Sequence, residues 1–289
     1  MTTFALVLGG GGNVGIAWET GVLAGLAEAG CDAREAALIV GTSAGSVVGS
    51  QVARGFDMRA EYRQLLDAGE RRTLARQEPD LEMMQRIFSL WGSFEEMTEA
   101  NCRAIGALAL QAKTPTEEEF LSVFVLADLP WPEGPLVTTA VDCETGAFAA
   151  FDRTSGAPLQ RAVAASCAVP GLFPPVTIEG RRYMDGGVRS VTNADLALRA
   201  SPDAALIVSP IVAGTSQNLG RFGSLQVEAE IERLRAAGVR TSLIAPGDAE
   251  REAFGPNLMD PSRRRPAAEA GYHQGLRAAD EVKAALGLA

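Results

Sequence analysis

The sequence contains a single histidine, His273, among its 289 residues. One histidine excludes metal sites built from several histidines, and any Ser-His-Asp triad would have to use it. Cysteine is also scarce, since the chain has only four and no two of them form a C-x-x-C pair (Cys31, Cys102, Cys143 and Cys167). Such widely spaced cysteines indicate buried, reduced thiols in a reducing compartment. We expect neither a bound metal nor a cofactor.

Positive charge and long apolar runs are lacking as well. The formal net charge of −10 argues against a nucleic-acid partner and against strong attraction to anionic lipid headgroups. No apolar run reaches the roughly 18 residues of a membrane-spanning helix. The first residues lack the basic start of a secretory signal. We therefore expect a cytoplasmic protein whose membrane contacts are peripheral and transient; no pattern indicates an oligomeric state.

What the sequence does contain is a regular alternation of strands and helices. Continuous apolar runs predict strands and helical spacing predicts helices, beginning with a strand at 4–8, a helix at 16–29, a strand at 36–40 and a helix at 46–54. This order predicts a three-layer α/β/α fold with a mainly parallel central sheet. Later strands are expected at 136–141, 147–151, 176–178, 181–184, 204–209 and 241–245, and later helices at 159–168, 224–237 and 266–286.

No internal repeat and no convincing linker divides the chain, so we expect one domain spanning residues 1–289. Residues 57–127 read as a mainly helical insertion into that domain. Within it, large apolar side chains recur at three- and four-residue spacing (Met83, Met84, Ile87, Phe88, Trp91 and Phe94). This spacing favours a core-facing stripe, with a mobile flap beside an apolar substrate as the alternative.

Residues 41–45, Gly-Thr-Ser-Ala-Gly, match the G-x-S-x-G pattern of a nucleophile elbow. A serine on such a sharp strand-to-helix turn has a strained backbone. Its neighbours Gly41 and Gly45 are expected to press against adjoining backbone, where no side chain fits. We interpret Ser43 as a nucleophile, and a serine that merely caps a helix is the alternative.

A glycine-rich turn, Gly9 to Gly12 followed by Gly15, leads from the first strand into the first helix. Such a turn exposes backbone N–H groups that bind anions. It could be a dinucleotide-binding fingerprint, but the elbow stands where that fold needs an acidic residue. We favour an oxyanion hole formed by Gly10, Gly11 and Gly12. A nucleotide- or anion-binding protein is the alternative function.

The serine needs a base, and two residues are candidates. Ser43, Asp185 and His273 occur in the chain order of an α/β-hydrolase triad. His273, however, falls inside the predicted helix 266–286, whereas a triad histidine is usually presented from a loop. Asp185 follows a strand and precedes two glycines. A buried carboxylate beside the serine can accept its proton, so we favour Asp185 over the alternative of a plain turn.

These motifs, in this order, resemble the patatin-like phospholipase family. Two further segments are similar to that family, Asp142 to Gly146 and Ala165 to Pro174, and the resemblance runs from about residue 4 to 200. It implies a serine acyl hydrolase that cleaves lipid or other acyl esters through a Ser-Asp dyad without histidine. Carried onto this chain, Ser43 is the nucleophile, Asp185 the general base, and the glycine turn supplies the oxyanion donors.

One position departs from the family pattern. Members often carry Arg or Lys where this chain has Val14, which removes that basis for a headgroup contact. The insertion 57–127 is expected to shape the acyl pocket, but no pattern in it encodes chain length or headgroup. A weakly catalytic regulatory protein that binds a lipid is a further alternative.

Overall fold

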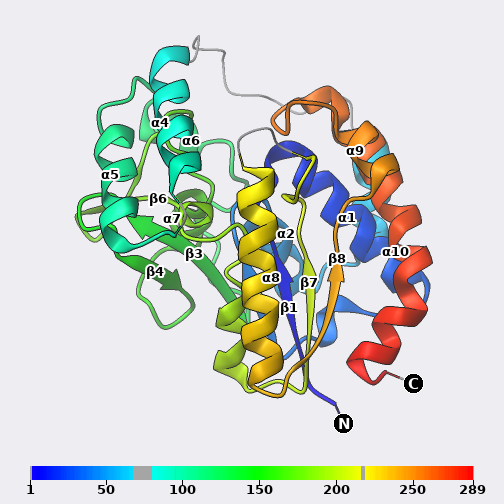
Figure 1. The fold of residues 1–289 in the computed structure, drawn as a ribbon. Helices are drawn as coiled ribbons and strands as arrows, with labels where there is room; N and C mark the ends of the chain where they lie inside the picture. The colour runs from blue at the N-terminus through cyan, green and yellow to red at the C-terminus, as the bar shows by residue number, and fades with distance from the viewer. Residues whose placement is uncertain (1, 68–79, 95, 216–218, 289) are drawn as a thin grey trace.

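The computed structural model describes residues 2–67, 80–94, 96–215 and 219–288. Its strands are β1 (Phe4–Leu8), β2 (Leu38–Gly41), β3 (Leu136–Asp142), β4 (Phe148–Phe151), β5 (Val176–Ile178), β6 (Arg181–Asp185), β7 (Ala204–Val208) and β8 (Arg240–Ile244). Among the described residues they form one eight-stranded sheet in the order β5-β6-β3-β2-β1-β7-β8, with β4 beside β3 (Figure 1). The pairings from β3 through β2, β1 and β7 to β8 are parallel, and those of β4, β5 and β6 are antiparallel. The predicted mainly parallel sheet is confirmed.

Helices cover both faces of this sheet, as predicted. They are α1 (Gly12–Glu28), α2 (Ala44–Ala53), α3 (Met58–Asp67), α4 (Leu81–Ser93), α5 (Glu99–Ala109), α6 (Glu117–Leu121), α7 (Leu159–Ser166), α8 (Gly220–Ala236), α9 (Asp248–Phe254) and α10 (Arg264–Leu286). Alternate residues of β1 point to opposite faces. Leu6 and Leu8 pack into the core that contains α1, α2 and α10, whereas Ala5 and Val7 pack into the core that contains α4, α5 and α8. The result is three layers.

Two strands share one edge of β3 and approach each other from opposite directions. Gly41, the last residue of β2, pairs in parallel with Thr138, and Asp185, the last residue of β6, pairs antiparallel with Ala140. Because β4 pairs with both Thr138 and Ala140 from the other edge, β2 and β6 must lie on the same edge. Their carboxyl ends therefore meet, two residues apart along β3.

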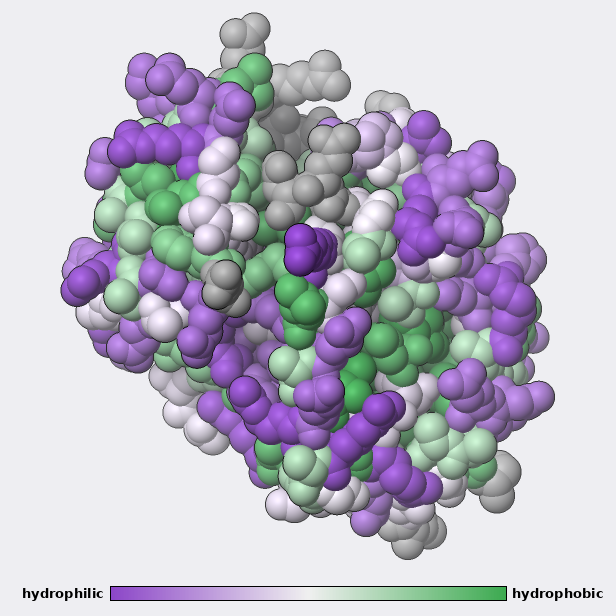
Figure 2. All heavy atoms as spheres, in the orientation of Figure 1, coloured by the Kyte–Doolittle hydropathy of each residue, from purple (hydrophilic) through white to green (hydrophobic). Residues whose placement is uncertain are grey.

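The described part of residues 57–127 contains the helices α3 to α6, while residues 68–79 and 95 lie outside the described part of the chain. On α4, Ile87 and Trp91 are buried, and Met83 and Phe88 pack half-buried against the same core. The core-facing interpretation of this stripe is therefore confirmed for these residues. Figure 2 shows apolar side chains among polar ones on the outer face over α4 and α5. In the described ranges, no helix has the length and apolar character needed to cross a bilayer.

Candidate active site

Ser43 stands on a strained turn between β2 and α2. Its φ of 52° and ψ of −116° lie where a side chain is disfavoured, at a cost of about 1–3 kcal/mol. Three hydrogen bonds hold this conformation. The Ser43 amide donates to the Ser166 hydroxyl (2.9 Å), and the Ser43 carbonyl accepts from the Ser46 hydroxyl (2.7 Å) and the Cys167 thiol (3.3 Å). Contacts from both α2 and the end of α7 therefore fix the turn.

The two glycines of the elbow lie against backbone. A Cβ on Gly45 would stand 2.1 Å from the Leu8 carbonyl oxygen, and one on Gly41 would stand 2.6 Å from the Gly45 carbonyl oxygen. Neither contact is with a side chain that could move aside. The Gly45 amide also donates to the Gly9 carbonyl (3.0 Å). The elbow is thereby joined to the glycine-rich turn, as expected for adjacent parallel strands.

Asp185 is buried beside Ser43, with only 3% of its surface exposed. Burial raises the pKa of Asp185 from 3.8 to about 7, and the Ser43 hydroxyl and the Gly187 amide oppose part of this rise. The Gly187 amide donates to the carboxyl at 2.7 Å. The pKa of this carboxyl therefore lies close to neutral pH.

The glycine-rich turn lies directly against the elbow. A Cβ on Gly10 would stand 3.5 Å from the Ser43 Cβ. The Gly10 amide, however, already donates to the Val191 carbonyl (2.8 Å). Of the three predicted oxyanion donors, Gly11 and Gly12 therefore remain. Among the described residues, the Gly11 and Gly12 amides have no acceptor. They open the 17-residue helix α1, whose N-terminus attracts negative charge.

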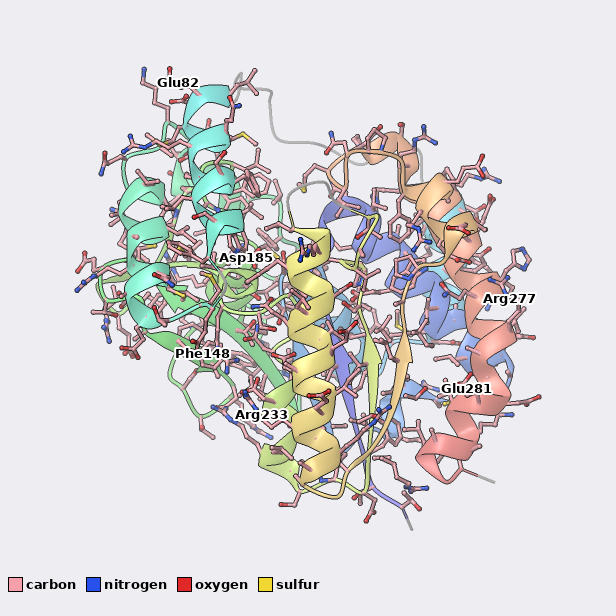
Figure 3. The ribbon with its side chains drawn as sticks, viewed as in Figure 1. Glu82, Phe148, Asp185, Arg233, Arg277 and Glu281 are labelled. Atoms are coloured by element: carbon pink, nitrogen blue, oxygen red, sulfur yellow. The ribbon has the colours of Figure 1, made fainter. Side chains whose placement is uncertain are left out.

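His273 is not part of this site. It is exposed on α10, where its ring packs against that of the neighbouring Tyr272. Figure 3 shows Asp185 in the centre of the molecule and Arg277, one helical turn after His273, at its outer side. Within the described residues, no three His, Cys, Asp or Glu side chains are grouped as metal ligands would be.

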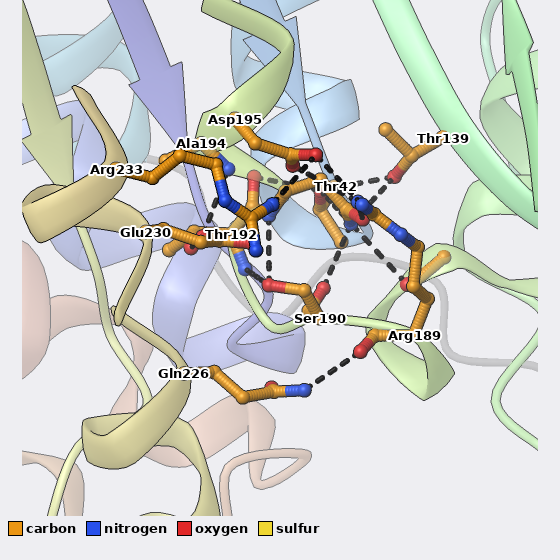
Figure 4. A network of polar contacts seen from close by, with 12 residues as sticks. Thr42, Thr139, Arg189, Ser190, Thr192, Ala194, Asp195, Gln226, Glu230 and Arg233 are labelled. Carbon is orange, nitrogen blue, oxygen red and sulfur yellow. Dashed lines mark hydrogen bonds and ion pairs between the residues drawn. The ribbon is translucent and has the colours of Figure 1, made fainter. Parts of the chain in front are cut away.

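Sequence reasoning did not single out a buried polar network behind the elbow (Figure 4). Thr42, the residue before Ser43, bonds through its hydroxyl to the Thr139 hydroxyl (2.9 Å) and to the Asn193 amide nitrogen (3.1 Å). The residues of this network are single Ser, Thr and Asn side chains from distant segments. Thr42 falls in the elbow motif, and Ser166, which bonds to Ser43, falls in the segment Ala165 to Pro174, but Thr139 and Asn193 fall in neither.

The fold and this geometry define the class: an α/β protein whose strained serine turn meets a buried aspartic acid and a glycine-rich helix N-terminus. Comparison with known families agrees, because residues 6–198 match the family model described as patatin-like phospholipase. The match covers well over half of the chain. The chain therefore belongs to the patatin-like phospholipase family.

Solved structures with a similar course of the chain have little sequence identity. VipD from Legionella pneumophila is 14% identical with a TM-score of 0.49, and the match covers 97% of this chain and 67% of that one. The type III effector protein ExoU is 15% identical (TM-score 0.39; 97% and 53% covered). Human GIVD cytosolic phospholipase A2, solved with a fluorophosphonate inhibitor, is 13% identical (TM-score 0.38; 99% and 59% covered). No curated protein matches the sequence.

Proposed function

We propose that this protein is a serine acyl hydrolase that cleaves carboxylic esters of lipids through a dyad of Ser43 and Asp185. The observation that carries the proposal is the meeting of β2 and β6, which sets a strained serine beside a buried carboxyl. Family membership supports a lipid ester as the substrate. No histidine is required, because Asp185 is close to the serine and basic enough to act alone.

The reaction would run in two halves. The Ser43 Oγ attacks the ester carbonyl carbon while Asp185 takes the hydroxyl proton, and the Gly11 and Gly12 amides stabilise the oxyanion. The leaving alcohol departs with the proton from Asp185, which leaves an acyl-enzyme. Asp185 then takes a proton from water, the hydroxide attacks the acyl carbon, and Ser43 is released with its proton restored.

The acyl chain would lie under the helical insertion of a single domain. The insertion reaches the site through α4, because a Cβ on Gly171 would stand 2.8 Å from the Ile87 side chain and 3.4 Å from that of Met84. Gly171 lies four residues after Cys167, whose thiol donates to the Ser43 carbonyl (3.3 Å). We therefore propose that residues 57–127 shape the acyl pocket. Val14 is fully buried, so a headgroup contact would have to come from other residues.

We further propose that the protein works in the cytoplasm and touches membranes only transiently. Its four free cysteines, including the buried Cys31, Cys102 and Cys143, suit a reducing compartment.

The test is hydrolysis of an ester and phospholipid series of increasing chain length, with fluorophosphonate labelling of the nucleophile. Ser43→Ala should lose both hydrolysis and labelling while keeping the wild-type circular dichroism spectrum. Substantial labelling of Ser43→Ala would overturn the assignment. Wild-type protein that is labelled but does not turn over would support the lipid-binding regulatory alternative. Nicotinamide-cofactor binding without ester hydrolysis would support the nucleotide-binding alternative.

A further inference from the structure

We propose that Asn193 is a positioning residue that sets the distance between Ser43 and Asp185. The role rests on the proposed function, because it concerns the same dyad. Asn193 contacts neither reacting group directly. It acts on the residue before the nucleophile and on the residue after the base.

The amide nitrogen of Asn193 bridges the two strand ends that carry the dyad. It donates to the Thr42 hydroxyl (3.1 Å) and to the Gly186 carbonyl (3.2 Å). Thr42 immediately precedes Ser43, and Gly186 immediately follows Asp185. The same nitrogen also lies within hydrogen-bond distance of the Ser190 carbonyl (2.8 Å) and the Thr139 hydroxyl (3.4 Å), so its two hydrogens are shared among four acceptors. One buried side chain therefore ties both turns together.

The surrounding bonds determine which way this amide faces. The Asn193 oxygen accepts from the Arg189 guanidinium (2.7 Å), so the nitrogen must point toward Thr42. Arg189 is itself held by two hydrogen bonds to Asp195 (3.0 and 2.7 Å). The bond from Arg189 thus fixes the orientation of the Asn193 amide.

The Thr42 hydroxyl is fully used in this arrangement. It donates to the Thr192 carbonyl (3.3 Å) and accepts from the Thr139 hydroxyl (2.9 Å) and from Asn193. A donor is therefore required at position 193, and an acceptor there would face the lone pairs of Thr42.

Asparagine suits this position for two independent reasons. Its backbone is left-handed, with φ 50° and ψ 40°, a conformation that asparagine adopts more readily than most residues. Its amide supplies both the donor toward Thr42 and the acceptor for Arg189. Aspartate keeps the size and the acceptor but loses the donor, and alanine loses both.

The consequence for catalysis is geometric. A displacement of about 1 Å between reacting groups can lower a rate about 100-fold. Without Asn193, Thr42 and Gly186 lose their shared partner, so Ser43 and Asp185 can drift apart. The Ser43 hydroxyl lowers the pKa of Asp185, so this drift should also raise that pKa.

The experiment compares Asn193→Asp and Asn193→Ala with wild type in the full chain, using an ester substrate and fluorophosphonate labelling. We expect kcat to fall about 100-fold, with KM within about threefold of wild type, since only the dyad is disturbed. The pH midpoint of kcat/KM should move upward. If a variant only contained less folded protein, kcat/KM would be lower at every pH and the pH midpoint would not move.

Glu230→Gln is the matched control. It belongs to the same network and keeps the acceptor for Ala194, but it touches neither Thr42 nor Gly186. Its kcat should stay within about threefold of wild type. Should the Asn193 variants fail to fold, Thr42→Val removes only the hydroxyl contacted by Asn193 and should give a smaller fall in kcat with the same upward pH shift.

The outcomes separate the two proposals. Folded Asn193 variants with wild-type kcat and an unmoved pH midpoint would overturn the positioning role and leave the proposed function intact. An equal fall in kcat for Glu230→Gln would also overturn it, because the effect would then belong to the loop as a whole. Wild-type protein without ester hydrolysis or labelling would overturn the proposed function and this role with it.

Discussion

Replacing Asp185 with asparagine should make the protein more stable at alkaline pH while abolishing ester hydrolysis. The pKa of Asp185 is about 7 in the folded protein and 3.8 in an exposed chain. The folded state therefore holds this proton more tightly than the unfolded state. The stability that the protonated Asp185 contributes is fully present below pH 3.8 and is lost as the pH rises through about 7.

The size of this effect follows from the pKa difference. Each pKa unit corresponds to about 1.4 kcal/mol, so the wild type should lose up to about 4 kcal/mol between about pH 4 and 8 through this residue. Asparagine carries no charge and can still accept the Gly187 hydrogen bond of 2.7 Å. Asp185→Asn should therefore match wild type near pH 4 and exceed its free energy of unfolding by up to about 4 kcal/mol at pH 8.

The assay is urea unfolding of both proteins at several pH values, followed by circular dichroism. Only the difference between the two proteins is interpreted, because other carboxyl groups titrate equally in both. Asp195→Asn is a control of opposite sign. Burial would raise the pKa of Asp195, but its bonds to Arg189 outweigh burial and hold the pKa below the ordinary value. That substitution should lose stability relative to wild type as the pH rises to about 4 or 5, and the difference should then stay constant up to pH 8, where the Asp185 variant still changes.

A constant difference between Asp185→Asn and wild type across the pH range would refute the reasoning, and so would lower stability of the variant at pH 8. The kinetics give an independent check. Because the base must be ionised, kcat/KM of the wild type should rise with pH around a midpoint of about 7. A midpoint near 4 would mean that Asp185 is not desolvated in the working enzyme.

Two further predictions concern the elbow and the histidine. Gly45→Ala should cost at least about 3 kcal/mol of unfolding free energy or prevent folding, because the new Cβ would stand 2.1 Å from the Leu8 carbonyl oxygen. Gly49→Ala in the same helix meets only side chains, those of Ile39 at 3.1 Å and Leu136 at 3.3 Å, and should change stability by less than about 2 kcal/mol in the same thermal or urea assay, because the gain in helix propensity offsets part of the overpacking. His273→Ala should keep kcat/KM within about twofold of wild type, since this residue is exposed on α10. A loss of more than about 100-fold would restore a triad that uses the histidine.

The sequence predicted the order of strands and helices well because apolar periodicity is a local property. Strand β5 has the predicted bounds, and α7 and α10 begin within two residues of theirs. Helix α1 begins at Gly12, four residues before the predicted start, because glycines hide the helical pattern there. Its first turn is held by a distant contact instead, in which the Val14 amide donates to the Leu258 carbonyl (3.0 Å).

Burial of polar residues could not be predicted, because it depends on tertiary packing and not on local periodicity. Glu19 lies in the middle of α1, where a charged residue suggests a solvent-facing side. It is fully buried, because α1 packs against α2, α3 and α10 as well as the sheet. Burial raises its pKa well above the ordinary value; the nearby Gly9 amide offsets only part of that rise and donates its own hydrogen bond to Val208. Such packing depends on tertiary contacts that no local pattern records.

The proposed role of Asp185 as the base agrees with both the scarcity of histidine and the topology of the sheet. A triad histidine is usually presented from a loop, whereas here an antiparallel strand brings Asp185 to the end of β2 along the edge of β3. Because Asp185 lies at the end of a strand inside the sheet, its carboxyl is buried, and burial raises its pKa to about 7. The same burial destabilises the protein when Asp185 is ionised. A higher pKa of this carboxyl is therefore accompanied by a lower free energy of unfolding at alkaline pH. The proposed dyad would therefore need rigid support from neighbouring residues, and the bonds of Asn193 to both strand ends would supply it.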